Sequence, residues 1–223
     1  VGSLASRDLI EARALACGAV LVLEPSADGG ALKTGRKGRG TFEVAVHGRA
    51  AHAGLEPEKG VNALVAVAHQ VLVIAGLGRP EVGTTVTPTV ASVGTTDNVV
   101  PAEGLIKVDV RVESADEKHR VETAMSALRP VDPQASIEVS GSINRPPMPE
   151  SASDTLWPLA QQVAPGIKGH AVGGGSDGNF TAAIGIPTLD GLGAVGGGAH
   201  ADHEYVVVDT MPDRARLVAG LVE

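Results

Sequence analysis

The feature that most constrains the fold of this 223-residue chain is an alternation of strand and helix patterns through its middle section. Residues 41–48 alternate apolar and polar side chains, which is typical of a strand with one buried face. Residues 57–75 instead repeat apolar side chains at the three- and four-residue spacing of an amphipathic helix. Strands are expected at 41–48, 84–93, 105–112 and 135–139, and helices at 57–75 and 116–128. This βαββαβ order predicts a ferredoxin-like unit.

The segments on either side of this unit have a different character. Residues 19–23 (AVLVL) form a short apolar run, which predicts a strand buried on both faces of a mainly parallel sheet. A Gly-rich, basic stretch at 29–40 is typical of a hinge or linker. Further helices are expected at 5–16, at 152–164 and from Met211 onward. Strands and helices of this kind predict an α/β layer.

We therefore predict an α/β fold class with three parts along the chain. Residues 1–36 and 148–223 are expected to form one α/β domain. Residues 37–147 are expected to form the ferredoxin-like (βαββαβ) domain inserted between them. With aromatic residues at only 2%, the cores must be built from Ala, Val, Leu and Ile.

Charge and composition exclude several classes of function. Lys and Arg number 18 against 26 Asp and Glu, and the net charge of −8 argues against nucleic acid as a partner. The chain shows neither a bilayer-spanning apolar run nor a signal-peptide pattern, so no membrane partner is expected. We expect a cytoplasmic protein, with the periplasm or secretion as alternatives because the opening lacks an initiator Met. The single cysteine, Cys17, rules out an internal disulfide and is expected to be a small buried side chain.

Two segments carry candidate metal ligands. Glu24 follows the apolar run 19–23, where α/β sheets place ligand-binding groups, although a solvated acid at a strand end is the alternative. His200 and His203 lie with two acidic residues in a Gly-rich loop that reads HADHE. Imidazole is a common metal ligand and neighbouring carboxylates often orient it. An ordinary polar loop is the alternative here.

Four residues in or beside the inserted unit are candidates for binding a substrate. His52, flanked by small residues in GRAAHAGLEP, could donate a hydrogen bond to a developing oxyanion, or be an ordinary surface histidine. Asn98 lies beside a predicted strand, Arg111 lies within one, and Arg145 precedes a Pro-rich stretch. Either arginine could hold a carboxylate in a bidentate fashion, or be a charge on a strand face.

The segment GGGSDG at 173–178 is a candidate anion site that includes Gly174, Gly175 and Ser176. It lacks the lysine of a phosphate-binding loop. Backbone N–H groups exposed before a helix could still bind a carboxylate. A plain turn with Asp177 as the helix cap is the alternative.

Read in order, these segments resemble the M20 metallopeptidase family, and its glutamate carboxypeptidase branch in particular. The resemblance extends over essentially the whole chain and rests on the order of SRDLIEA, LEPSADG, GRAAHAGLEPEKGVNAL, TTDNVVPAE, VDVRVES, NRPPM, GGGSDGNF and GGAHADHEYV. Family members have a catalytic α/β domain with two zinc ions and an inserted ferredoxin-like lid that also forms the dimer. The resemblance implies zinc as the cofactor, a homodimer through the lid, and a peptide or N-acyl amino acid as substrate.

The resemblance also implies a role for each candidate residue. Glu24 resembles the carboxylate ligand of one zinc, and His200 resembles the histidine ligand of the other. His52 resembles the lid histidine that reaches the active site of the partner subunit and stabilises the tetrahedral intermediate. Positions that would touch the substrate carboxylate or the oxyanion are Asn98, Arg111 and Arg145. Positions that would line the substrate site are Gly174, Gly175 and Ser176.

The sequence departs from the family pattern in its metal ligands. The histidine of an H-x-D motif, the bridging aspartate and the Glu-Glu pair that supplies the general base have no counterpart here. In the family they precede the SRDLIEA segment, with which this chain nearly begins. A catalytic zinc needs about three protein ligands, so Glu24 and His200 do not suffice for two.

We therefore expect the C-terminal part of a zinc-dependent hydrolase that cleaves a peptide or N-acyl amide bond next to a carboxylate-bearing residue. This chain by itself is expected to be inactive. One alternative is a non-catalytic module that dimerises or binds a partner through the βαββαβ unit. The other alternative is a degenerate family member that binds one metal ion for structure.

Overall fold

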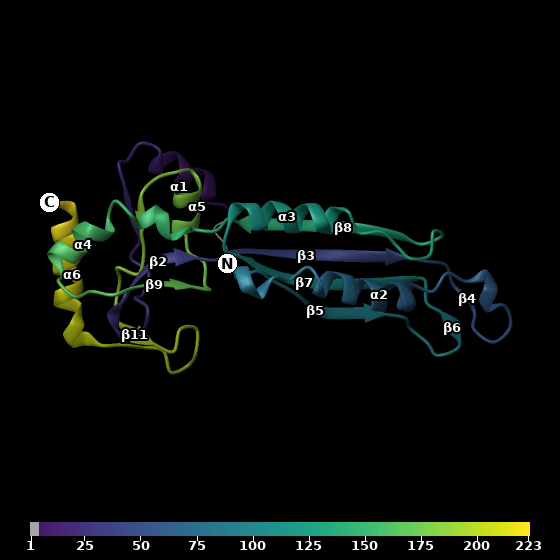
Figure 1. Ribbon diagram of the computed structural model, residues 1–223. Coiled ribbons are helices and arrows are strands. Elements are labelled where there is room, and N and C mark those ends of the chain that lie inside the picture. Colours follow the sequence, from purple (N-terminus) through teal and green to yellow (C-terminus); the bar gives the residue numbers. More distant parts are fainter. Residues whose placement is uncertain (1–4) are drawn as a thin grey trace. The chain divides into compact units, whose positions relative to one another are not determined.

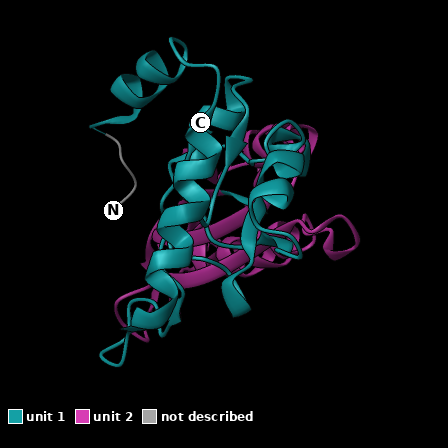
Figure 2. Cartoon of the chain, turned by 90° about the vertical axis from the view of Figure 1, so that its left-hand side faces the viewer, with its two compact units in different colours: residues 1–38, 145–223 teal, residues 39–144 magenta. Residues whose placement is uncertain are grey.

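The computed structural model describes residues 5–223 (Figure 1), so the first four residues of the predicted segment 1–36 lie outside the described part. The chain divides into two compact units (Figure 2). Unit 1 combines residues 1–38 with residues 145–223, and unit 2 comprises residues 39–144. Within the described part, no helix has both the length and the apolar character needed to cross a membrane.

Unit 2 is built on a four-stranded sheet with the order β5-β7-β3-β8. The strands are β3 (Gly38–His47), β5 (Thr85–Val93), β7 (Glu103–Val112) and β8 (Ser136–Arg145). Helix α2 (Ala63–Ala75) connects β3 to β5, and helix α3 (Ala115–Ser126) connects β7 to β8. Each helix thus links two strands that have a third strand between them, and β5 runs antiparallel to β7. This arrangement confirms the predicted ferredoxin-like unit.

The core of unit 2 follows from the period-two pattern of β3 and β7. Every second side chain of these strands is buried, and the two helices supply the rest of the core. The buried strand residues are Phe42, Val44, Val46, Ile106, Val108, Val110 and Val112, and the buried helix residues include Ala63, Val67, Ile74, Val121 and Met125. Because each fully buried Val, Ile or Met contributes about 1.5–3 kcal/mol, this layer specifies which face of the sheet points inward.

The helices of unit 2 begin where a polar side chain can cap them. Helix α2 starts at Ala63 because the Asn62 Oδ1 accepts hydrogen bonds from the N–H groups of Leu64 (2.9 Å) and Val65 (3.2 Å). The predicted first turns at 57–62 are not part of it, and Pro57–Lys59 forms a separate 3₁₀ turn, η2. Ser114 caps α3 in the same way.

The rest of unit 2 consists of short elements. Strand β4 (Ala51–His52) pairs antiparallel with β6 (Val99–Val100), so that His52 lies opposite Val99. A further 3₁₀ turn, η3, covers Pro80–Val82. The β4–β6 pair brings the segment around His52 against the segment around Asn98.

Unit 1 contains two short pairs of parallel strands. Strand β1 (Val20–Leu21) pairs with β10 (Thr188–Leu189), and β2 (Leu32–Arg36) pairs with β9 (Gly169–Val172). A single bridge between Lys33 and Asp190 joins β2 to the end of β10. The helices are α1 (Arg7–Ala14), α4 (Trp157–Val163), α5 (Gly178–Ala183) and α6 (Met211–Val222). The core that they cover consists of Leu32, Leu156, Ala160, Leu189, Leu192 and Leu217.

Unit 1 also has short connecting elements. The hairpin strands β11 (Gly196–Gly197) and β12 (Tyr205–Val206) pair antiparallel. The 3₁₀ turns are η1 (Asp28–Gly30), η4 (Glu150–Ser153) and η5 (Val208–Thr210).

Three expectations about unit 1 were wrong. The stretch 29–40 is not a linker, because β2 and the start of β3 lie within it, and β2 has a partner in β9 that the sequence did not reveal. Gly35, Gly38 and Gly40 serve close packing: a Cβ on Gly35 would lie 3.3 Å from the Ala171 Cβ. Cys17 is exposed rather than buried. The strand predicted at 19–23 is only half-buried, and Leu23 is 63% exposed.

Candidate functional site

The Gly-rich loop 173–178 is held by a buried ion pair. The Arg36 Nε and Nη2 donate to the two carboxylate oxygens of Asp190, each at 2.7 Å, and both side chains are almost fully buried. The Ser176 hydroxyl donates to the same carboxylate, and the Arg36 Nη1 donates to the Gly174 carbonyl at 2.9 Å. The loop backbone is therefore attached at two points to a charge pair that water does not reach.

Asn179 ties the same loop to the chain segments that enter and leave unit 1. Its side chain is fully buried, and its Oδ1 accepts a hydrogen bond from the Ser176 N–H at 2.8 Å. Its Nδ2 donates to the carbonyls of Lys37 (3.2 Å) and Pro146 (2.8 Å). All three hydrogen bonds go to backbone groups, so Asn179 fixes backbone position rather than charge.

Arg145 lies against this loop. Its Nη1 donates to the Ser176 carbonyl and to the Asp177 Oδ1 (3.3 Å), and its Cζ lies 4.4 Å from the centroid of the Phe180 ring. A Cβ on Gly175 would come within 2.6 Å of the Arg145 Cδ, so the arginine stem requires glycine at that position. The structure thus brings together four of the predicted residues: Arg145, Gly174, Gly175 and Ser176.

The two predicted metal ligands lie in exposed parts of unit 1. Glu24 follows β1, and its carbonyl accepts a hydrogen bond from the Gly193 N–H at 2.8 Å. His200 lies in an exposed turn with a φ of 66°, and its N–H donates to the Glu204 Oε2 at 3.4 Å. Residues 5–223 contain no group of three or more His, Cys, Asp or Glu side chains that could hold a metal ion. A carboxylate and an imidazole are suitable donors for zinc, but the described residues do not fit a complete metal site.

The pKa of Lys33 on β2 depends on burial and on the charges around it. Partial burial lowers the pKa of the Lys33 amine below its ordinary value, and the neighbouring Arg36 lowers it further. The carboxylates of Asp190 and Glu24 act in the opposite direction. The Lys33 amine is therefore influenced by the charges of both the buried ion pair and the predicted metal ligand.

His52 and Asn98 lie together in unit 2. The His52 Nδ1 accepts hydrogen bonds from the N–H groups of Gly54 (3.1 Å) and Leu55 (3.2 Å). An acceptor nitrogen carries no proton, so the neutral ring has its proton on Nε2 and can donate from there. The Ala53 N–H donates to the Asn98 carbonyl at 2.9 Å, which holds the two segments side by side.

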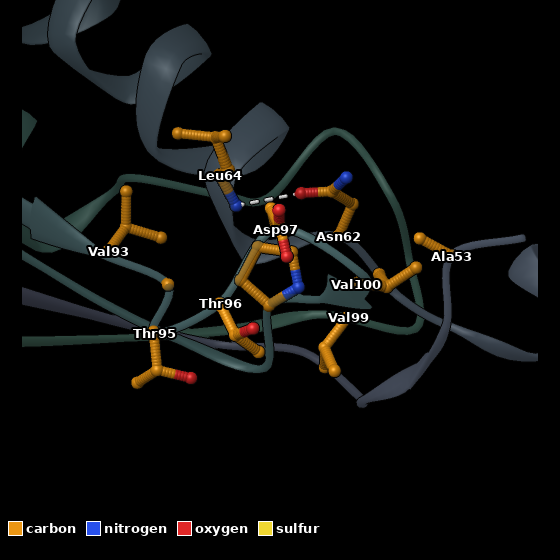
Figure 3. A pocket seen from close by; sticks show the side chains of 11 residues that line it. Ala53, Asn62, Leu64, Val93, Thr95, Thr96, Asp97, Val99 and Val100 are labelled. Carbon is orange, nitrogen blue, oxygen red and sulfur yellow. Dashed lines mark hydrogen bonds between the residues drawn. The ribbon is translucent and has the colours of Figure 1, made fainter.

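A pocket of about 550 Å³ lies next to these residues in unit 2 (Figure 3). Its walls come from the start of α2, the end of β5 and the loop that leads to β6. The side chains of Leu64, Val93 and Val99 make it partly apolar, and Asp97 and two threonines add polar groups. The N–H groups at the start of α2 are already bound by Asn62, so the helix end offers no open anion site here.

Arg111 and Arg145 belong to different units. Arg111 is on β7 in unit 2, and its Nε donates to the Asp109 Oδ1 at 2.8 Å. Arg145, in contrast, belongs to unit 1 and contacts the Gly-rich loop.

Sequence reasoning missed the residues that hold the site together. These residues are Arg36, Asn179, Asp190 and Arg214, and all four are buried. Arg36 lay in a stretch predicted to be a linker, and Arg214 lay in a helix with several exposed charges. The one signal that could have found them is Asp190 at the end of the apolar run 186–190, because a carboxylate there must be paired if it is buried.

Comparisons with known proteins agree with this architecture. The M20 peptidase dimerisation domain matches residues 34–130. Carboxypeptidase G2 of Pseudomonas sp. (strain RS-16) is 31% identical over 99% of this chain and 56% of its own length. The chain therefore spans about half the length of this curated relative.

Solved structures show the same fold. The aminopeptidase PepT from Bacillus cereus covers 97% of the chain with a TM-score of 0.73, at 24% identity and over 61% of its own length. The YxeP protein of Bacillus subtilis, described as a dinuclear metal-binding peptidase from the M20 family, covers 97% with a TM-score of 0.66, at 17% identity and over 60% of its own length. The chain therefore contains an M20 peptidase dimerisation domain at residues 34–130, within a sequence that is similar to carboxypeptidase G2 over 99% of its length.

Proposed function

We propose that this chain is part of a zinc-dependent M20 hydrolase that cleaves a peptide or N-acyl amide bond next to a carboxylate-bearing residue. The observation that carries the proposal is that Arg145 lies against the loop Gly174–Ser176, which is itself anchored to the buried Arg36–Asp190 pair. A guanidinium held beside a loop of backbone amides is suited to binding a carboxylate. The similarity to carboxypeptidase G2 over 99% of the chain supports the same reading.

Arg145 would hold the substrate carboxylate. Its hydrogen bonds to described residues come from Nη1, and its side chain keeps 12% of its surface exposed. The Phe180 ring and Gly175 restrict where the guanidinium can lie. This preorganisation lowers the entropy lost when the carboxylate binds.

His52 would stabilise the oxyanion that forms when the amide carbonyl is attacked. Two backbone amides occupy its Nδ1, so its Nε2–H is available as a neutral donor. Asn98, on the neighbouring segment, and Arg111 are further candidates for contacts with the substrate or the oxyanion. In a homodimer His52 would serve the active site of the partner subunit.

Glu24 and His200 would each supply one ligand to a zinc ion. When bound, zinc polarises a carbonyl and lowers the pKa of bound water. The described residues form no three-ligand cluster, so we propose that this chain alone is inactive. The remaining zinc ligands and the general base would come from a further segment of the protein.

We also propose that the protein is a homodimer through unit 2. One face of α2 exposes an apolar stripe, with Leu64 50%, Val65 64% and Leu72 74% exposed. Strand β5 lies at the edge of the sheet, and Val90 on it is 50% exposed. An apolar helix face beside an open sheet edge can pair with a copy of itself across a two-fold axis.

Hydrolysis assays test the proposed chemistry. The 223-residue chain and the longest reading frame that contains it would be compared on N-acetyl-L-glutamate with added Zn²⁺. We expect turnover from the longer protein only. Arg145→Met in that protein is expected to raise the KM for N-acetyl-L-glutamate much more than it lowers kcat, because the arginine is proposed to bind the substrate carboxylate. Robust turnover by the shorter chain that His200→Ala abolishes would contradict the proposal that it is inactive alone.

One observation favours the alternative of a non-catalytic module, namely that the described residues lack a three-ligand metal cluster. Metal analysis after dialysis against a weak chelator separates the cases. A longer protein that retains about two zinc ions per chain supports the hydrolase. A longer protein that retains none and still sediments as a dimer supports the module.

A further inference from the structure

Arg214 is a buried arginine whose partners are glycine carbonyls. It lies on α6 and is 9% exposed. Its Nε donates to the Gly193 carbonyl and its Nη1 to the Gly30 carbonyl, each at 2.9 Å, and its Nη2 donates to the Gly191 carbonyl. Burial lowers the pKa of the guanidinium from its ordinary value, yet arginine keeps its charge at neutral pH.

Two of the three carbonyls that Arg214 binds, those of Gly191 and Gly193, belong to the segment next to Glu24. The Gly193 N–H donates to the Glu24 carbonyl at 2.8 Å, and the Leu192 N–H donates to the Val22 carbonyl at 3.1 Å. A Cβ on Gly193 would lie 2.4 Å from the Leu23 carbonyl oxygen, so the two backbones are in direct contact. The segment 191–193 therefore fixes the position of the backbone that follows β1.

The other end of this segment is also fixed. Asp190 directly precedes it and is held by Arg36 and Ser176. Arg36 thus fixes the segment through a carboxylate, and Arg214 fixes it through two carbonyls. A planar guanidinium can serve three acceptors that diverge in one plane, whereas the ammonium of lysine cannot reproduce this fork.

We propose that Arg214 is a positioning residue that holds the segment 191–193 and, through it, the backbone of Glu24. The functional value of this role rests on the proposed function, in which Glu24 binds a metal. A ligand on an exposed strand end needs support of this kind, because metal sites lose affinity when the groups around a ligand are removed.

Amide hydrogen exchange, measured by NMR on the metal-free 223-residue chain, tests the proposal. The variants are Arg214→Lys, which keeps the charge, and Arg214→Met, which keeps an apolar stem. The matched control is Arg216→Lys on the same helix, because the Arg216 side chain is 75% exposed and, among residues 5–223, pairs only with the exposed Asp213 at 2.5 Å. The reporters are the amides of Leu192 and Gly193, and the reference is the amide of Leu217 in α6.

We expect exchange at Leu192 and Gly193 to become about tenfold faster or more in both Arg214 variants, while Leu217 changes less than about threefold. The control is expected to leave all three amides unchanged. Unchanged exchange at the two reporters overturns the proposal. A uniform increase throughout unit 1, or a failure of Arg214→Lys to fold, also overturns it, because Arg214 would then be a general structural residue.

The experiment is independent of the metal. Whether Glu24 binds zinc is tested separately, by the zinc affinity of a Glu24→Gln variant of the longer protein. An unchanged affinity there would refute the proposed ligand and leave the exchange result valid. Unchanged exchange in the Arg214 variants would refute the positioning role and leave the assignment of Glu24 as a zinc ligand valid.

Discussion

Arg36 and Asp190 are 154 positions apart in the chain and form a bidentate ion pair that is almost completely buried. The pair joins β2 to the end of β10, and the Gly-rich loop is attached to it through Gly174 and Ser176. A buried charge pair is a poor source of stability but an effective way to specify one arrangement, because neither charge tolerates another environment. Its position indicates that unit 1 uses it to shape the proposed carboxylate site.

Removing one charge of this pair is expected to destabilise unit 1 strongly. Arg36→Met or Asp190→Leu leaves the other charge buried and unpaired, which costs about 3–5 kcal/mol. The double variant removes both charges and is expected to be more stable than either single variant. Urea unfolding of the four proteins measures these differences.

The control for this comparison of single and double variants is Arg39→Met. Arg39 is 52% exposed and lies 3.8 Å from Asp109, so its loss is expected to change stability by less than about 0.5 kcal/mol. A double variant as unstable as the sum of the two single variants would show that Arg36 and Asp190 do not act as a pair.

The carboxyl group of Glu117 makes the stability of unit 2 depend on pH in the acid range. Hydrogen bonds from Arg120, at 2.6 and 2.7 Å, lower the pKa of its carboxyl from 4.5 to about 2. The unfolded chain therefore takes up a proton before the folded chain does. This contribution to stability is complete above pH 4.5 and is lost as the pH falls toward 2.

We expect Glu117→Gln to lose about 1–2 kcal/mol of unfolding free energy at pH 7. The difference from the parent chain should shrink steadily as the pH is lowered toward 2. Denaturant titrations at a series of pH values measure it. Asp213→Asn, in an exposed pair on α6, is the control and should show no such trend. A difference that is the same at all pH values would contradict the ion-pair explanation.

Unit 2 could be predicted from the sequence because its elements are long and their periods are distinct. The alternation through Phe42, Val44 and Val46 can be read in one strand without knowledge of its neighbours. The start of α2 was misplaced because apolar spacing continues from Val61, whereas the helix begins only after the Asn62 cap. Such a cap depends on backbone conformation, which the apolar spacing does not report.

Unit 1 could be predicted only in outline. Its strands contain two to five residues, and their stability comes from partners far away in the chain. β2 looked like a linker because Gly35 and Arg36 are poor strand residues unless Glu150, Ala171 and Asp190 are known to lie beside them. The residue types alone singled out the Gly-rich loop and Arg145 as candidates, but the buried residues that hold them become visible only in three dimensions.

The tautomer of His52 is a direct consequence of its hydrogen bonds. Since Gly54 and Leu55 donate to Nδ1, the neutral ring should carry its proton on Nε2. Long-range proton–nitrogen NMR correlations at pH 8 should therefore show the Nε2–H form for His52. His119, exposed on α3, is the reference for a mixture of forms. A dominant Nδ1–H form at His52 would contradict the proposed donor to the oxyanion.

The apolar stripe of α2 makes the dimer proposal testable with single substitutions. Leu72 is 74% exposed, so Leu72→Asp leaves the core of unit 2 intact. If the stripe lies at the centre of an interface, a buried unpaired carboxylate there should weaken the dimer at least about tenfold. Sedimentation equilibrium over a range of concentrations measures this change.

The matched control is Leu9→Asp, because Leu9 on α1 is also largely exposed, at 60%, but lies in unit 1. This substitution should leave the dissociation constant unchanged if the interface belongs to unit 2. Far-ultraviolet circular dichroism of both variants would verify that the helices remain folded. A Leu72→Asp chain that dimerises as tightly as the parent would exclude the α2 stripe from the interface, and a Leu9→Asp chain that alone became monomeric would move the interface to unit 1.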